Sequence, residues 1–109
     1  MTDATASSVG EPEASDRLWD ATIVELLRIR LLEDDWDGEG TEAPGHAVVD
    51  RAIALAQDLR SLAFAPPDRV HACVNPTVCF EWHNTLCYTE IEVVSPIEVE
   101  RRSVRLGST

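Results

Sequence analysis

The sequence predicts an α+β domain, in which two N-terminal helices pack on one face of a three- to four-stranded antiparallel β-meander. In the first half of the chain apolar residues recur at three- and four-residue spacing, as they do on one side of a helix. After Pro66 and Pro67 the apolar residues alternate with polar ones, and β-branched and aromatic residues are frequent, which is typical of strands. A chain of 109 residues, 44% of them hydrophobic, is long enough for one core. We therefore predict a single domain over residues 16–106.

The N-terminal segment differs in composition from the rest. Residues 1–15 are mostly small and polar, which predicts a disordered tail. Ser15 or Asp16 is then placed to cap a helix that begins at Arg17, because a side-chain oxygen there accepts hydrogen bonds from free backbone N–H groups.

The first helix carries a wide apolar face. Its predicted stripe comprises Trp19, Ile23, Leu26, Leu27 and Leu31. Further apolar residues outside the stripe are Val24, Ile29 and Leu32. Such a face is covered either by the sheet or by another chain, and burial within the chain is the expectation.

A second helix is predicted over residues 46–63, and Pro66 and Pro67 end it. Its predicted apolar face comprises Val49, Ala52, Ile53, Ala56, Leu59, Leu62 and Ala63.

Residues 77–82 and 85–94 are predicted to form a hairpin with His83 and Asn84 at the turn. In that register Trp82 faces Thr85, Phe80 faces Cys87 and Val78 faces Thr89. The predicted core side comprises Val78, Phe80, Trp82, Cys87, Ile91 and Val93. The opposite side comprises Cys79, Glu81, Leu86, Tyr88, Glu90 and Glu92. Two further strands are expected within residues 69–74 and 97–105.

The chain is strongly acidic, with nine basic residues, all Arg, against twenty acids and a net charge of −11. A field of this sign repels nucleic acids and anionic lipid surfaces and attracts cations or basic proteins. The alternative is that the acidic residues only keep the protein soluble. No apolar run approaches the length of a membrane span, and no secretory signal starts the chain. We therefore expect a cytoplasmic protein with three reduced Cys, in contact with neither nucleic acid nor membrane.

The stretch DDWDGEGTEAPGH, residues 34–46, follows Glu33 between the two predicted helices. Gly38 and Gly40 suit positive φ, Asp37 suits hydrogen bonds to backbone N–H groups, and Trp36 is expected to fold inward as an anchor. Structural roles are thus predicted for Trp36, Gly38, Gly40 and, in the sheet, Trp82. The predicted partner-binding residues are Asp34, Asp35, Asp37, Glu39, Glu42, Tyr88 and Glu90.

The same loop resembles the start of a calcium-binding EF-hand. With Gly38 at position 6, Glu33, Asp35 and Asp37 take positions 1, 3 and 5. Position 12, which needs a bidentate carboxylate, falls on Pro44, so a tight turn is the better interpretation.

Five soft ligands raise the question of zinc: His71, Cys73, Cys79, His83 and Cys87. Their spacing is that of strands rather than of zinc knuckles, and alternation places Cys79 and Cys87 on opposite faces. A site built from His71, Cys73 and one further group stays open, while Cys87 is expected to be a small core residue. We predict no cofactor and no metal ligand.

Catalysis has little support in the sequence. His83, Cys79 and Glu81 are close together, but no glycine-rich oxyanion loop or phosphate-binding motif accompanies them. The expectation is that the protein is not an enzyme.

The sequence DDWDGEG, the Pro behind it, the amphipathic helix and a strand ending FEW resemble a set of small uncharacterised bacterial proteins. These share a Trp-Asp-Gly-x-Gly-Ala loop, an Ala-Pro helix start and a Leu-Glu-Trp strand. The resemblance covers residues 20–94 and implies a fold but no activity. This chain departs from the pattern at Thr41 and Glu42, where the family has Ala, and at Asn75 and Pro76, where a turn often has Asp-Gly.

These observations predict a small acidic, non-catalytic protein-interaction domain that binds a basic partner, with toxin neutralisation or an immunity-like role as one concrete form. The alternatives are a domain that binds zinc or calcium and a minor hydrolase. Homodimerisation through the first helix or an open strand edge is a separate possibility.

Overall fold

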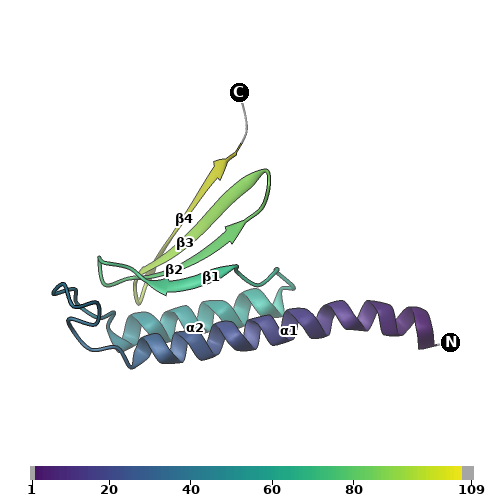
Figure 1. The fold of residues 1–109 in the computed structure, drawn as a ribbon, viewed down its shortest axis with the longest axis horizontal. Helices are drawn as coiled ribbons and strands as arrows, with labels where there is room; N and C mark the ends of the chain where they lie inside the picture. The colour runs from purple at the N-terminus through teal and green to yellow at the C-terminus, as the bar shows by residue number, and fades with distance from the viewer. Residues whose placement is uncertain (1, 107–109) are drawn as a thin grey trace.

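The computed structural model describes residues 2–106 of the chain and, within them, the side chains from residue 13 onward. Two helices, α1 (Thr2–Arg30) and α2 (His46–Ser61), precede four strands. The strands are β1 (Arg69–Ala72), β2 (Val78–His83), β3 (Cys87–Ser95) and β4 (Glu98–Arg105). They form one antiparallel sheet in the order β1-β2-β3-β4. The helices lie side by side against one face of this sheet (Figure 1), which confirms the predicted α+β fold.

The beginning of α1 differs from the prediction. The helix is assigned from Thr2, whereas the sequence predicts a start at Arg17. Asp16 is consequently not a cap but lies within the helix, and its carboxylate accepts a hydrogen bond from Arg60 of α2 at 3.2 Å. The side chains of residues 1–12 lie outside the described part of the chain, and the disorder predicted for residues 1–15 stays a prediction.

The predicted apolar stripe of α1 is only half right. Trp19 and Leu26 are buried as predicted, while Leu27 and Leu31 are 49% and 79% exposed. Ile29, predicted to lie outside the stripe, is buried. The covered side is set by the two elements that contact the helix, α2 and β1, and is rotated away from Leu27 and Leu31. Trp19 fixes that rotation, because its indole N–H donates to the carbonyl of Phe64 at 3.1 Å. The helix therefore leaves an apolar face outside the core.

α2 buries Val49, Ala52, Ala56 and Leu59, as the sequence predicts, but it ends at Ser61 and leaves Leu62 69% exposed. The N–H of Phe64 bonds to the carbonyl of Leu59, and the N–H of Ala63 bonds to that of Arg60. This pattern is a Schellman motif, which requires a left-handed residue; here Ala63 has φ 65°.

The predicted hairpin register is wrong. β2 and β3 pair Val78 with Val93, Phe80 with Ile91 and Trp82 with Thr89. The reason is the turn: the side-chain carbonyl of Asn84 accepts the N–H groups of Leu86 and Cys87, both at 2.7 Å, so the chain reverses at Thr85 and Leu86. β3 is thereby displaced by an even number of residues, and the side chains of β2 and β3 keep their predicted faces. Leu86, predicted on the polar side of the strand, lies in the turn instead.

The core lies between the helices and the sheet. Val78, Phe80 and Val93 contribute from the sheet, with Ile91 and Trp82 partly buried beside them. Trp82 stacks on Phe80, with ring centroids 6.1 Å apart, and donates to the carbonyl of Ala65 at 2.9 Å. This is the structural role predicted for Trp82. Cys87, in contrast, is only half-buried and lies outside the core cluster.

Candidate functional site

The structure places the predicted partner-binding residues at two separate positions, one in the loop between the helices and one on the sheet face opposite the helices. We call residues 33–42 the acidic loop. The second group lies on what we call the polar face, formed by side chains of β1 to β4 that point away from the helices. Tyr88 and Glu90 belong to the polar face, whereas the other predicted partner-binding residues belong to the acidic loop.

The acidic loop is braced by its own aspartates. Asp34 accepts the N–H of Ala43 at 3.0 Å, and Asp35 accepts that of Gly40 at 2.7 Å. Asp37 accepts the N–H of Glu39 at 3.0 Å. These bonds replace the secondary-structure bonds that a loop lacks, and they hold the backbone in one conformation.

Asp37 also accepts the hydroxyl of Thr41, and that bond, followed by the one from the Glu39 N–H, lowers the pKa of Asp37 below its ordinary value. Gly38 and Gly40 have φ values of 77° and 80°, which confirms the predicted glycine roles.

Trp36 is not the inward anchor that the sequence predicts. It is 36% exposed, lies outside the core cluster, and its indole N–H reaches the carbonyl of Glu42 at 3.3 Å. Pro44, which follows the acidic loop, is buried instead. Hydrogen bonds to the aspartates hold the loop, so it needs no buried aromatic side chain. The Trp36 ring therefore stays at the surface of the acidic loop.

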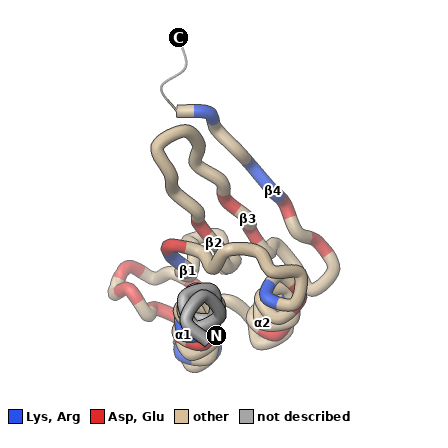
Figure 2. The backbone as a smooth tube through the Cα atoms, turned by 90° about the vertical axis from the view of Figure 1, so that its right-hand side faces the viewer, with Lys and Arg blue, Asp and Glu red and all other residues tan. Residues whose placement is uncertain are grey.

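The charges of the acidic loop are not compensated. Figure 2 shows acidic and basic positions along the backbone. Among the described residues, the Arg ion pairs join Arg28 to Glu25, Arg30 to Asp50, Arg60 to Asp16 and Asp20, and Arg102 to three glutamates. Within the part of the chain whose side chains are described, no ion pair includes any of the six acids of the acidic loop.

The exposed apolar side chains of α1 lie toward its C-terminal end, which the acidic loop follows. Val24 and Leu27 are three residues apart and share one side of α1, and Leu31 follows in the turn directly after the helix ends at Arg30. We call these three residues the α1 apolar face. Val24 is 57% exposed. Leu31 lies only two residues before Glu33, so the α1 apolar face and the acidic loop are continuous along the chain.

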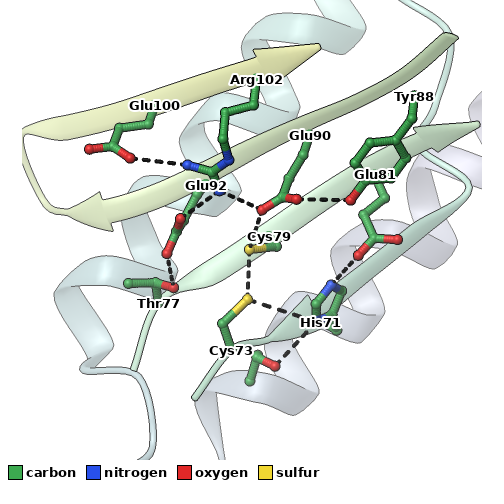
Figure 3. Close-up of polar contacts among 11 residues, drawn as sticks. His71, Cys73, Thr77, Cys79, Glu81, Tyr88, Glu90, Glu92, Glu100 and Arg102 are labelled. Carbon is green, nitrogen blue, oxygen red and sulfur yellow. Dashed lines mark hydrogen bonds and ion pairs between the residues drawn. The ribbon is translucent and has the colours of Figure 1, made fainter. Parts of the chain in front are cut away.

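The polar face is a connected network rather than an open acidic surface (Figure 3). The hydroxyl of Tyr88 donates to Glu90 at 2.8 Å, and Arg102 of β4 donates to Glu90 at 2.6 Å and to Glu92 at 2.7 Å. Thr77 donates to the other oxygen of Glu92. Tyr88 and Glu90, predicted to meet a partner, thus already hold each other in place.

Arg102 of β4 forms ion pairs with three glutamates, Glu90, Glu92 and Glu100. Burial raises the pKa of Glu90, but hydrogen bonds from Arg102, Tyr88 and Cys79 outweigh it and leave that pKa below its ordinary value. For Glu92, the bonds from Thr77 and Arg102 lower the pKa in the same way.

A second part of the polar face brings two thiols and an imidazole together. The sulfur atoms of Cys73 and Cys79 are 2.6 Å apart, and the Nδ1 atom of His71 lies 3.9 Å from Cys73 Sγ. On its other side, His71 Nε2 contacts Glu81 Oε2 at 2.5 Å, and Glu81 also contacts His83 at 3.1 Å. The arrangement joins β1, the turn after it and β2, as Figure 3 shows.

The surroundings shift the pKa values of the two thiols in opposite directions. A hydrogen bond from Cys79 lowers the pKa of Cys73 to about 7, with the charge of His71 contributing in the same direction. The same bond, together with burial, raises the pKa of Cys79. Of the two thiols, Cys73 is therefore the one that ionises at the lower pH.

Sequence reasoning left the third partner of His71 and Cys73 open, and the structure identifies it as Cys79. A hairpin centred on Asn75 places residue 71 opposite residue 79, as the register shows. The short turn containing Asn75 and Pro76 was the available signal. Cys87 lies on the other side of the sheet, as alternation along β3 predicts.

The order Cys73, His71, Glu81 superficially matches a nucleophilic triad. The sulfur to Nδ1 distance of 3.9 Å, however, is longer than direct proton transfer requires, and the nearest partner of Cys73 Sγ is another thiol. His83, which the sequence groups with Cys79 and Glu81, contacts Glu81 and packs edge-on against Tyr88.

Comparison with known proteins adds no relative: no protein-family model matches the chain, and neither the curated proteins nor the solved structures contain a match. Within the described residues, no helix is both long enough and apolar enough to cross a membrane.

Proposed function

We propose that this chain is a non-catalytic protein-interaction domain that binds a basic partner protein through the α1 apolar face and the acidic loop. The observation that carries the proposal is the continuity of an exposed apolar helix face with a braced loop whose described carboxylates have no counter-charge. An apolar strip supplies binding free energy, and the carboxylates beside it select a partner of opposite charge.

The loop is suited to this role because its conformation is set before binding. The hydrogen bonds of Asp34, Asp35 and Asp37 already restrict the backbone, so the loop loses less conformational entropy on binding than a flexible segment would. Exposed Trp36 adds a residue type that is enriched among interface residues with large binding contributions.

The charge also bears on the rate of association. A net charge of −11 on a chain of this size accelerates encounter with a basic protein, and added salt reduces that acceleration. A protein that neutralises a toxin by covering a basic active site is one form of this function. A cytoplasmic location belongs to the same proposal.

The test is affinity capture from the source cells with two variants of the immobilised full chain. Leu27→Gln/Leu31→Gln removes the apolar contact, and Glu33→Gln/Glu39→Gln/Glu42→Gln removes charge while leaving the bracing aspartates intact. Leu86→Gln and Asp58→Asn are matched controls, since both residues are exposed elsewhere on the chain.

We expect a basic protein to be retained by the wild type and both controls, to be lost with both multiple variants, and to bind more weakly as salt rises. The captured protein is then purified and its dissociation constant measured by calorimetry for each variant. An acidic partner, equal affinity of all variants, or a partner that binds independently of salt would each contradict the proposal. Sedimentation of the free chain distinguishes self-association through the same face.

A further inference from the structure

The thiols and imidazole of the polar face have no part in the proposed partner surface, and their arrangement has its own chemistry. One donor atom each from His71, Cys73 and Cys79 lies within 4.8 Å of the other two. A second group of this kind, Cys79 with Glu90 and Glu92, shares the central sulfur. Two sulfur atoms, a ring nitrogen and carboxylate oxygens thus converge around Cys79.

We propose that His71, Cys73 and Cys79 bind a zinc-type divalent metal ion, with a carboxylate oxygen of Glu90 as the fourth ligand. This donor set is typical of zinc, which is usually four-coordinate in proteins and accepts sulfur, nitrogen and oxygen ligands. The inference is independent of the proposed partner, because neither the acidic loop nor α1 supplies a ligand.

Two of the donor separations fit a tetrahedral site, whereas Glu90 groups with Cys79 but not with His71 and Cys73, so its carboxylate must move toward them. Zinc bonds of about 2.0 to 2.3 Å place neighbouring donors roughly 3.3 to 3.8 Å apart. The separation of His71 Nδ1 from Cys73 Sγ is 3.9 Å, and that of Cys79 Sγ from Glu90 Oε2 is 3.4 Å. The two sulfur atoms, at 2.6 Å, must move apart. Cys73 lies one residue beyond the end of β1 and is only half-buried, so a change of its side-chain rotamer is the movement that separates the sulfur atoms.

The groups behind the ligands already have the orientation that a metal site needs. Glu81 holds Nε2 of His71, so Nδ1 lies on the side of the thiols, 3.9 Å from Cys73 Sγ and 3.2 Å from the carbonyl oxygen of Ala72. A carboxylate in contact with the distal nitrogen of a ligating histidine is a common feature of zinc sites. Glu90 is positioned in turn by Tyr88 and Arg102.

The exchange balances in charge. Both cysteines bind as thiolates and His71 as the neutral imidazole, so binding of a divalent ion releases whatever thiol protons Cys73 and Cys79 still carry. When both start as thiols, two protons leave and the net charge of the polar face stays the same. No oxidant or reductant is involved. A disulfide between the same two cysteines is the competing outcome, but it gives no role to His71 or Glu90.

The experiment is a cobalt titration of the purified full chain, kept reduced by a phosphine. Cobalt(II) reports its ligands directly, because thiolate ligands give a near-ultraviolet charge-transfer band and tetrahedral geometry gives intense visible bands. We expect both signals to saturate at one ion per chain and to disappear when zinc is added. We also expect zinc to raise the melting temperature and a chelator to reverse the effect.

Matched variants identify the ligands. Cys73→Ser and Cys79→Ser should each weaken cobalt binding at least tenfold and reduce the charge-transfer band, and His71→Ala should weaken it as well. Cys87→Ser is the control, because this third thiol lies on the opposite face and should leave the spectrum unchanged. Glu81→Gln, which removes the carboxylate behind His71 without removing a ligand, should weaken binding by about 10- to 100-fold.

Circular dichroism establishes that each variant is folded before titration. For a variant that is unfolded, protection of the wild-type thiols from alkylation by added zinc provides the second readout. The proposal is overturned if the reduced wild type gives no charge-transfer band, or if the Cys87→Ser substitution abolishes binding while Cys73→Ser does not. It is equally overturned if the isolated protein contains a Cys73–Cys79 disulfide and the reduced form binds no metal.

Discussion

Single residues decide how two turns of this chain are built. Asn84 sets the reversal between β2 and β3, because its side-chain oxygen accepts two consecutive backbone N–H groups. Ala63 ends α2 in a left-handed conformation that an L-residue other than glycine adopts only at a cost. Asn84 suits its position and Ala63 does not. Substitution of Asn84 should therefore lower stability, and substitution of Ala63 by glycine should raise it.

Substitution of Ala63 by Gly should stabilise the protein. Glycine has no Cβ to oppose φ 65°, and the Schellman hydrogen bonds of Ala63 and Phe64 are retained. We expect the free energy of unfolding in urea to rise by about 0.5 to 1 kcal/mol. Ala65→Gly, just beyond the motif, is the control and should not stabilise. An equal gain in both variants would mean that the helix end is not the cause.

Substitution of Asn84 by Ala should destabilise the hairpin. The N–H groups of Leu86 and Cys87 then lose their acceptor, which costs about 1 kcal/mol of unfolding free energy after partial replacement by water. Urea unfolding of Asn84→Ala and of the neighbouring Thr85→Ala measures the difference. Equal midpoints for the two variants would show that the Asn84 side chain does not set the turn.

At the scale of elements, α1 has two apolar sides with different fates. One packs against α2 and β1, and the other is the α1 apolar face at the surface. Periodicity shows that a helix is amphipathic, but it does not fix the rotation of a helix on which almost every side carries an apolar residue. Neighbouring Leu26 and Leu27 lie on opposite sides of this division.

Leu26→Ala and Leu27→Ala should therefore have very different effects. Leu26 is fully buried, and its truncation leaves a cavity that should lower the free energy of unfolding by about 2 to 5 kcal/mol. Leu27 is 49% exposed, and its truncation should change stability by less than about 1 kcal/mol. Thermal and urea unfolding of the two variants measure both values. Similar losses would indicate that α1 is rotated differently or that another chain covers Leu27.

For the molecule as a whole, the polar face links stability to pH. The pKa values of Glu90 and Glu92 lie below their ordinary value of 4.5, because Arg102 and neighbouring donors favour the carboxylate form. The pKa of Glu81 is also lowered: burial raises it, but hydrogen bonds from His83 and His71 outweigh that effect. A carboxylate whose pKa is lowered by folding stabilises the folded state once the pH exceeds the pKa of the unfolded chain.

The contribution of these glutamates should be present in full above about pH 5 and should be lost as the pH falls from 4.5 through their folded pKa values. Urea unfolding at several pH values between about 7 and 3 follows the loss. In Arg102→Met the ion pairs to Glu90 and Glu92 are missing, so the variant should be less stable near neutral pH and its stability should fall less on acidification. Parallel pH curves for the wild type and the variant would contradict this assignment.

Much of the fold followed from the sequence alone. The change from helical to alternating spacing predicts the order of elements, and alternation assigns the sheet faces correctly even where the predicted register is wrong. The charge of the acidic loop and the positive φ of Gly38 and Gly40 also follow from local sequence. These are short-range properties, fixed by the period of the backbone and the chemistry of single residues.

Tertiary structure decided what depends on contacts between distant segments. The rotation of α1, the exposed position of Trp36 and the convergence of Cys79 with His71 and Cys73 each require the packing or the register of two elements. When one strand is displaced by two residues against its neighbour, each side chain changes its cross-strand partner but keeps its face of the sheet. The sequence therefore determines which groups point in one direction, and only the packed sheet determines which of them come within bonding distance.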